Sequence, residues 1–168
     1  MVATVVLGRR TAQPERLTAH IDRLYRAAWL LCGSPHDAED LVQETYARVL
    51  SRPRVLRRRD ELPYLLKALR NTYLTSLRTA SRRPRTVEVP GDDLGVFASS
   101  DAPPDVAAEH GELLAAIRAL PDDLREALVA VDIVGLSYRE AARALATRET
   151  TITMRVFRAR QRVARAMA

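Results

Sequence analysis

Apolar side chains recur along this chain at helical spacing, and the pattern predicts an all-α fold. They recur at this spacing in residues 17–31, and again in residues 38–49, 62–77, 113–120, 124–131 and 152–163. Pro121 starts a new predicted helix that ends at Gly135. No stretch alternates for long with the two-residue period of a strand. The positions expected to face a core are Leu17, Ile21, Leu24, Ala28, Leu31, Ala38, Leu41, Val42, Thr45, Val49, Leu62, Leu65, Leu69, Leu77, Leu113, Leu114, Ile117, Leu120, Leu124, Leu128, Val131, Ile152, Val156, Ala159 and Val163.

Helix boundaries can also be predicted from local signals. Gly33 should end the first helix, and Ser34 followed by Pro35 is a typical start for the second. Pro53 should stop that helix, and a third is expected from about residue 60 to residue 80. Near the C-terminus, the sequence from Ser137 to Glu140 matches the S-x-x-E capping box, which opens a short helix. A break over residues 146–149 separates it from a final amphipathic helix.

The helical pattern is interrupted by a segment rich in proline, glycine, serine and acids. Residues 86–111 contain six acids and no lysine or arginine, which is typical of a linker. We therefore expect a loose N-terminal arm over residues 1–14 and a first helical bundle over residues 15–82. A flexible acidic linker over residues 83–108 would then lead to a second bundle over residues 109–168.

Charge indicates the kind of partner. The chain has 27 Lys+Arg and 21 Asp+Glu, a formal net charge of +6, and Lys67 is its only lysine. A basic protein without an apolar run long enough to cross a bilayer favours a polyanionic partner such as nucleic acid. The single cysteine, Cys32, excludes an intrachain disulfide and fits a reducing cytoplasm.

One helix runs against this basic balance. Asp37, Asp40 and Glu44 are spaced at i, i+3 and i+7, so they share one stripe of the second predicted helix. DNA would repel such a stripe, whereas a basic protein surface would not. An ordinary solvated helix face is the alternative interpretation.

The C-terminal helix pair has the arrangement of a helix-turn-helix. A short capped helix, a tight break and a second helix rich in arginine match that motif. In such motifs the start of the second helix meets base edges, while flanking arginines meet phosphates. A solvated basic helix end is again the alternative.

Both halves resemble one family. The segments ALPDDLREAL, GLSYREAA and RVFRAR are similar to the C-terminal domain of bacterial sigma factors of the extracytoplasmic-function (ECF) class. SPHDAEDLVQETYARVL resembles that family's polymerase-binding helix, and ELPYLLKALRNTYLTSLR its promoter-melting helix. The resemblance implies a sigma-2-like first bundle and a sigma-4-like second bundle. The chain departs from the usual family residues at Tyr64, Thr75, Ala146, Thr150 and Met154, and the last two lie at the base-reading end.

The resemblance implies three sets of binding residues and no catalytic group, metal or cofactor. Contact with the clamp of the polymerase's largest subunit is implied for Asp37, Asp40, Leu41, Gln43 and Glu44. Contact with the minus-10 element, including capture of a flipped base, is implied for Arg57, Arg58, Arg59, Lys67, Arg70, Asn71 and Arg78. Contact with the minus-35 element is implied for Arg148, Thr150, Thr151, Thr153, Met154, Arg155 and Arg158, with Thr151 and Arg155 on bases and Arg158 on phosphate.

The resemblance further implies a role for the linker and a set of partners. Asp92, Asp93 and Asp101 would enter the polymerase cleft, where they either mimic nucleic acid or serve only as a solubilising tether. The expected partners are core RNA polymerase, through its clamp and flap regions, promoter DNA, and an anti-sigma protein. The expected location is the cytoplasm, on the nucleoid when active. Tyr64 and Tyr73 would either stack on a base or pack in the core.

Two other functions fit the sequence less well. A DNA-binding regulator without polymerase contact would leave the acidic stripe unexplained. A di-metal carboxylate enzyme would need Glu-x-x-His pairs on facing helices, and the residues three before His20, His36 and His110 are Leu17, Gly33 and Ala107. The sequence contains no phosphate-binding loop or nucleophile elbow either. An alternative sigma factor is therefore the predicted function.

Overall fold

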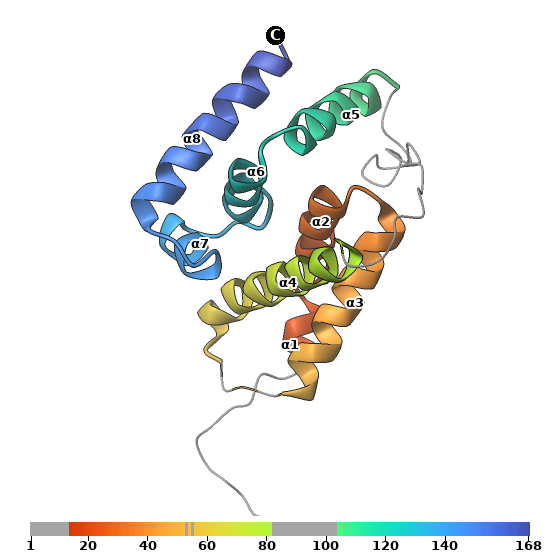
Figure 1. The fold of residues 1–168 in the computed structure, drawn as a ribbon, viewed down its shortest axis with the longest axis vertical. Coiled ribbons are helices and arrows are strands. Elements are labelled where there is room, and N and C mark those ends of the chain that lie inside the picture. The colour runs from red at the N-terminus through yellow and green to blue at the C-terminus, as the bar shows by residue number, and fades with distance from the viewer. Residues whose placement is uncertain (1–13, 53, 55, 82–103) are drawn as a thin grey trace, which may run out of the picture.

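The computed structural model describes residues 14–52, 54, 56–81 and 104–168, and every regular element in them is helical (Figure 1). The all-α prediction is confirmed for this part of the chain. None of the described helices is long and apolar enough to cross a membrane.

The described residues of the first half form four helices around the buried Trp29. Helices α1 (Pro14–Thr18) and α2 (Ile21–Cys32) replace the single helix predicted over residues 17–31. A turn separates them, in which the His20 N–H donates to the Leu17 carbonyl at 3.1 Å. The apolar spacing continues across the turn because Leu17 and Leu24 both pack into the same core. Ile21 was predicted to face inward, but it is half-exposed beside the turn.

Helix α3 (Pro35–Ser51) begins and packs as the sequence predicts. Gly33 ends α2 with a φ of +83°, a left-handed conformation that glycine adopts without strain. The Ser34 hydroxyl then accepts a hydrogen bond from the Asp37 N–H at 3.2 Å. The predicted apolar face is buried in full: Ala38, Leu41, Val42, Thr45 and Val49. Pro53, the expected helix stop, lies outside the described residues.

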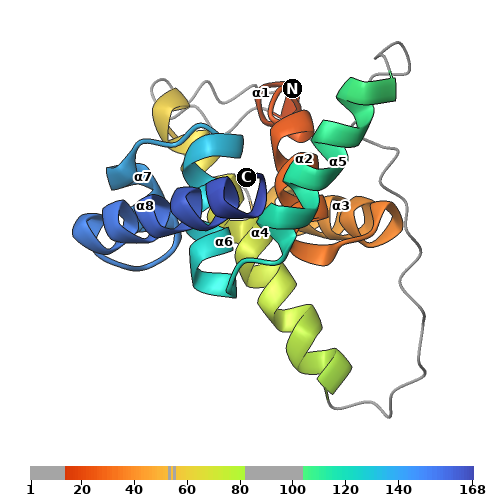
Figure 2. The same ribbon diagram turned by 90° about the horizontal axis from the view of Figure 1, so that it is seen from above.

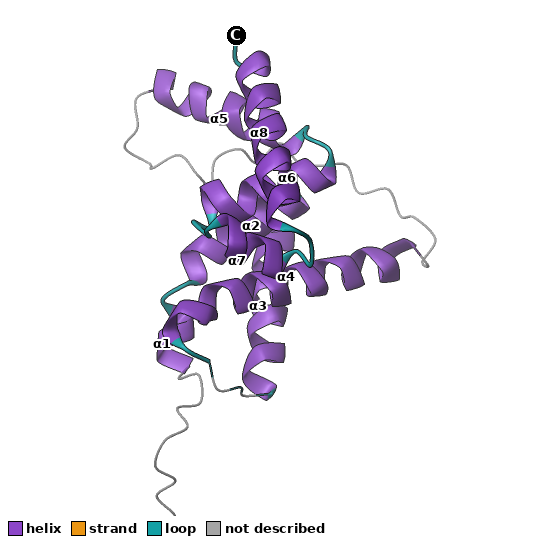
Figure 3. Cartoon of the chain, turned by 90° about the vertical axis from the view of Figure 1, so that its left-hand side faces the viewer, coloured by secondary structure: helices purple, strands orange, loops and turns teal. Residues whose placement is uncertain are grey.

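Helix α4 (Arg58–Ser81) crosses this layer and extends beyond it. Leu62, Leu65 and Leu69 are buried against α2 and α3, as predicted. The C-terminal part of α4 projects away from the other helices (Figures 2 and 3). Leu77 was predicted to be inward but is 46% exposed, because the packed helices do not cover this end.

The second half, over residues 104–168, is a succession of helices of different lengths. Helix α5 (Pro104–Arg118) begins at a proline within the predicted linker, so residues 104–108 are helical while 83–103 lie outside the described part. Helix α6 (Asp122–Leu128) continues into the π-helical turn η2 (Val129–Ile133). The capping box at Ser137 opens α7 (Tyr138–Ala144), and α8 (Glu149–Ala166) follows. Leu113 is exposed, contrary to the prediction that it faces the core.

The two halves pack against each other through a shared core. Helix α4 contacts α7, and α2 contacts both η2 and α5. The Arg118 guanidinium lies over the Trp29 ring, 5.4 Å from its centroid. At a second point, Arg70 Nε of α4 donates to Glu126 Oε2 of α6 at 2.9 Å, and both side chains are largely buried. The first and second bundles therefore form one compact body in this structure.

Candidate functional site

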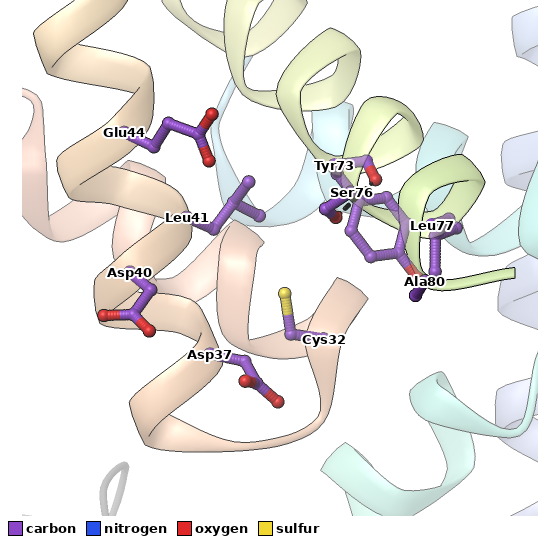
Figure 4. A pocket seen from close by; sticks show the side chains of 9 residues that line it. All are labelled: Cys32, Asp37, Asp40, Leu41, Glu44, Tyr73, Ser76, Leu77 and Ala80. Carbon is purple, nitrogen blue, oxygen red and sulfur yellow. Dashed lines mark hydrogen bonds between the residues drawn. The ribbon is translucent and has the colours of Figure 1, made fainter. Parts of the chain in front are cut away.

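The acidic stripe lines a hollow between α3 and α4. Its volume is about 340 Å³, and Asp37, Asp40 and Glu44 form one wall (Figure 4). Apolar side chains complete the hollow: Leu41 from α3, and Tyr73 and Leu77 from α4. The exposed Leu77 gives the site an apolar patch, which sequence periodicity had placed in the core. The hollow can therefore bind a basic surface that also carries an apolar side chain.

The carboxylates of this hollow have only local partners among the described residues. Asp37 Oδ2 accepts from the Ser34 hydroxyl at 2.8 Å, Asp40 lies 3.5 Å from His36 Nε2, and Glu44 lies 2.5 Å from Arg48 Nη2. Exposed pairs of this kind contribute only ~0–1 kcal/mol each, so an incoming cation can replace them at little cost. Gln43 is exposed but does not line the hollow.

Cys32 also lines this hollow, and its environment makes it unreactive. Burial, reinforced by the negative charge of Asp37, raises the pKa of the Cys32 thiol to about 12. A thiol with such a pKa is neutral near pH 7, and the thiolate is the nucleophilic form. No group of three or more His, Cys, Asp or Glu side chains that could hold a metal ion occurs among the described residues.

A second hollow, of about 410 Å³, lies toward the C-terminal end of α3 and has the opposite charge. Arg48, Arg52 and Arg54 line it together with Tyr64 and Asn71 of α4. The Arg54 guanidinium lies 5.9 Å from the centroid of the Tyr64 ring, at the limit of a cation–π contact. The arrangement offers positive charge, an aromatic ring and an amide in one place, which suits an unstacked base and its phosphate.

The structure divides the predicted minus-10 residues into two groups. Lys67, Asn71 and Arg78 are exposed on α4, and the run Arg57–Arg59 is exposed before and at its start. Arg70 is different, because it is held in the ion pair with Glu126 between the two halves. Tyr73 packs inward and donates its hydroxyl to the Leu31 carbonyl at 3.0 Å, whereas Tyr64 borders the basic hollow.

The three arginines of the basic hollow were missed by sequence reasoning. Arg48 and Arg52 belong to the end of α3 and the turn after it, whereas Tyr64 and Asn71 belong to α4. Only the packing of α3 against α4 brings them together. A usable signal was nevertheless present in the sequence, since arginines are dense from residue 48 to residue 59.

The predicted minus-35 residues lie at the start of α8 with different exposures. Arg148 is the N-cap residue, and Arg148, Thr150, Thr153 and Met154 are exposed. Thr151 is half-buried, and the Thr153 hydroxyl already donates to the Glu149 carbonyl at 3.0 Å. Met154 and Phe157 are the most exposed large apolar side chains of α8, at 50% and 56%. Phe157 was missed by the sequence analysis, although it stands within RVFRAR.

Two predicted DNA contacts on α8 differ in their surroundings. Arg158 is exposed, and no acidic side chain of the described residues pairs with it. Arg155 is half-buried, and its Nε lies 3.3 Å from Asp123 Oδ2 of α6. The linker acids Asp92, Asp93 and Asp101 lie outside the described residues.

Comparisons with known proteins bear on both halves. The family model for sigma-70 region 2 matches residues 17–83, and the model for sigma-70 region 4 matches residues 110–163. Together these two models cover most of the chain, in the order found in sigma factors.

Curated relatives show which class of sigma factors the chain resembles. The ECF RNA polymerase sigma factor SigE of Mycolicibacterium smegmatis is 34% identical over 162 residues, which is 93% of this chain and 63% of that protein. The ECF RNA polymerase sigma factor EcfG of Rhodopseudomonas palustris is 34% identical over 148 residues, or 88% of this chain and 80% of that protein. The chain belongs to the ECF sigma factors. This sigma factor is therefore one of the transcription initiation factors that direct RNA polymerase to promoters.

Solved structures share the fold. The sigma factor RpoE of Bartonella quintana, solved in complex with the anti-sigma factor NepR, superimposes with a TM-score of 0.65 at 25% identity. The match covers 90% of this chain and 94% of that one. CnrH, solved with the cytosolic domain of CnrY, gives a TM-score of 0.58 at 21% identity and covers 89% and 83% of the two chains. The latter likeness concerns the fold alone.

Proposed function

We propose that this sigma factor binds core RNA polymerase through the acidic hollow and opens promoter DNA at the basic hollow. The observation that carries the proposal is the separation of charge on the first half. Asp37, Asp40 and Glu44 line one hollow, while Arg48, Arg52 and Arg54 line another farther along the same helix and in the turn after it. The two hollows therefore suit different partners, one cationic and one anionic.

The proposed polymerase contact combines steering by charge with burial of apolar surface. Exposed ion pairs contribute little affinity, so the carboxylates orient the encounter and Leu77 supplies buried area. Leu41 is only 5% exposed, so it acts in this proposal mainly as the floor of the hollow. Gln43 stays a proposed contact at the edge of the surface.

The proposed melting step is capture of one unpaired base in the basic hollow. Extracting a base from the duplex costs a few kcal/mol, and binding of the extruded base offsets that cost. Asn71 would bond the base edge, Tyr64 would provide an aromatic face, and Arg52 and Arg54 would hold the flanking phosphates, since Arg48 is already paired with Glu44. Lys67, Arg78 and the run Arg57–Arg59 would hold the single strand on either side.

The proposed minus-35 contact is the outward face of α8. At the N-terminal end of α8, the side chains that would lie near the DNA groove are Arg148, Thr150, Thr151 and Thr153. Met154 and Phe157 would meet thymine methyl groups and Arg158 a phosphate, since these three side chains are exposed on the same side. The flap of the polymerase and an anti-sigma protein are proposed as further partners. Support for the latter is that the structural neighbour RpoE was solved with an anti-sigma factor.

The test is reconstitution with core RNA polymerase. A promoter is first recovered by run-off transcription from a genomic library with the wild-type chain. A fluorescent base analogue then replaces the non-template base of the minus-10 element, and its emission rises when the base leaves the stack. We expect Asn71→Ala to abolish that rise while core binding is kept. Asp40→Lys with Glu44→Lys should abolish core binding itself.

Two results would refute the proposal. A wild-type chain that never associates with core polymerase would exclude the polymerase-binding role. An unchanged fluorescence rise in the Asn71→Ala and Arg52→Ala variants would exclude capture in the basic hollow. Arg26→Ala, on an exposed residue of α2 outside both hollows, is the matched control and should leave core binding and fluorescence at wild-type values.

A further inference from the structure

Helix α8 carries arginines in two different environments. Its inward stripe is Ile152, Val156 and Ala159, all fully buried. With about 100° of rotation per residue, Met154 and Phe157 lie on the opposite side, where both are exposed. Arg155 and Arg160 fall between these two faces, one on each flank of the buried stripe.

Each flanking arginine is paired with an acid from the neighbouring helix. Arg160 makes two hydrogen bonds to Asp132, from Nε to Oδ2 at 3.0 Å and from Nη2 to Oδ1 at 2.7 Å. On the other flank, Arg155 Nε lies 3.3 Å from Asp123 Oδ2. A bidentate arginine–carboxylate pair fixes orientation as well as distance.

The two acids are placed to hold α8 from both sides. Asp123 lies in α6 and Asp132 in η2, nine residues farther along the chain. Helix α6 packs against α8 between these two points of attachment. The two ion pairs therefore bracket the α6–α8 contact, one near the start of α6 and one in the π-helical turn.

This geometry leaves Arg155 and Arg160 poorly suited to bind phosphate. A guanidinium with a carboxylate at hydrogen-bonding distance is already neutralised, so it releases few counterions from DNA. Hydrogen bonding to Asp132 also raises the pKa of Arg160 above its usual value, which keeps the charged pair intact. Arg158 and Arg160 are both exposed, but no acid of the described residues pairs with Arg158.

We propose that Arg155 and Arg160 are positioning residues, which hold α8 against α6 through Asp123 and Asp132 so that Met154, Phe157 and Arg158 face the DNA. The inference rests on the proposed role of α8 in reading the minus-35 element. It revises the sequence-based expectation that Arg155 reads a base. It also makes two acidic residues necessary for binding to a polyanion.

The sign of the effect of removing an acid tests the proposal. Holoenzyme is formed from core RNA polymerase and the full chain, and its Kd for a labelled duplex carrying the selected promoter is measured over a series of KCl concentrations. Removal of an acid that lies near DNA but has no structural role should tighten binding, because its repulsion of the phosphates is lost. We expect Asp132→Asn to weaken binding by about three- to tenfold instead, since the helix loses its bidentate partner.

Matched variants separate positioning from direct contact. Exchanging the pair, Asp132→Arg with Arg160→Asp, should restore Kd to within about twofold, as a coupled pair allows. Arg160→Lys should weaken binding as much as Arg160→Gln, because lysine keeps the positive charge but lacks the planar guanidinium that makes two hydrogen bonds to one carboxylate. Arg158→Gln should lower the salt slope by about 0.9, whereas Asp132→Asn and Arg160→Gln should leave the slope unchanged. Thermal unfolding of each variant verifies that it folds, and Arg160→Lys substitutes for any variant that does not.

The outcomes distinguish this inference from the proposed function. Tighter or unchanged DNA binding by the Asp132→Asn variant would overturn the positioning role. So would a salt slope that Arg160→Gln lowers as much as Arg158→Gln does. If Arg158→Gln changes neither affinity nor slope while Asp132→Asn still weakens binding, the proposed DNA-facing surface of α8 is wrong and the positioning role stands.

Discussion

The turn between α7 and α8 contains a residue whose replacement should stabilise the protein. Ala146 has a φ of +52° and is the one described non-glycine residue with a positive φ. The Thr147 N–H donates to the Ala142 carbonyl at 2.9 Å, and the Ala146 N–H lies 3.4 Å from the Arg143 carbonyl. These bonds form a Schellman motif, in which the residue at the position of Ala146 is usually glycine.

The magnitude follows from two opposing contributions to the free energy of unfolding. A left-handed conformation costs a residue with a Cβ about 1–2 kcal/mol, which Ala146→Gly would remove. Glycine gains more freedom in the unfolded chain, which offsets about 0.5–1 kcal/mol. Ala146 is exposed, so no packing is lost. The expected net stabilisation is about 0.5–1 kcal/mol, or a rise in Tm of roughly 1–4 °C.

Urea and thermal unfolding followed by circular dichroism measure this change. The control is Ala115→Gly, at an exposed position within α5, where the same chemical change should destabilise the chain by about 0.5–1 kcal/mol. Opposite signs for the two variants are the expected result. If Ala146→Gly destabilises the protein as Ala115→Gly does, Ala146 does not adopt the left-handed conformation and the argument fails.

Three further predictions concern the first half and its contact with the second. The raised pKa of Cys32, about 12, should make alkylation by iodoacetamide at pH 9 roughly 10²–10³-fold slower in the folded chain than in urea, and equal rates would contradict this. Glu126→Gln should destabilise the chain by about 1–3 kcal/mol, because it leaves the largely buried Arg70 unpaired, and a double-mutant cycle with Arg70→Gln should be non-additive. Gly33→Ala should lower the free energy of unfolding by about 1–2 kcal/mol, because alanine is strained at this positive φ. Most of this loss should persist in an Arg118→Ala background, where the clash with Arg118 is relieved but the backbone strain is not.

Local features of the fold were predictable because their causes lie within a few residues. The start of α3 depends on Ser34, Pro35 and the nearby Asp37 N–H, all adjacent in sequence. The capping box of α7 is similarly contained between Ser137 and Glu140. Such signals act through hydrogen bonds that close within one helical turn, so the sequence alone is sufficient to read them.

Periodicity was less informative about what covers a helix. Leu77 and Leu113 follow the apolar spacing of their helices, yet both are exposed. Spacing gives the phase of an apolar face but not whether another helix reaches it. For Leu77, the end of α4 projects past the helices that bury Leu69, and this exposure gives the acidic hollow its apolar patch.

The candidate site was likewise only partly predictable from the sequence. The stripe of Asp37, Asp40 and Glu44 could be found from sequence because all three residues belong to one helix. The basic hollow could not, because Arg52 and Asn71 meet only when α3 packs against α4. Likewise, an arginine-rich α8 was evident from the sequence, but which of its arginines are paired depends on acids contributed by α6 and η2.

The sequence by itself determined most of the helices, the caps of α3 and α7, the two sigma-like halves, and which segments are acidic or basic, although it predicted one helix in place of α1 and α2. These properties depend on neighbours within about one helical turn, or on a family pattern spread over the whole chain. The tertiary structure alone decided which arginines of α8 are paired with acids and which have no acidic partner among the described residues. It also decided that Arg70 joins the two halves, since an ion pair forms between side chains 56 positions apart only when folding brings them within hydrogen-bonding distance.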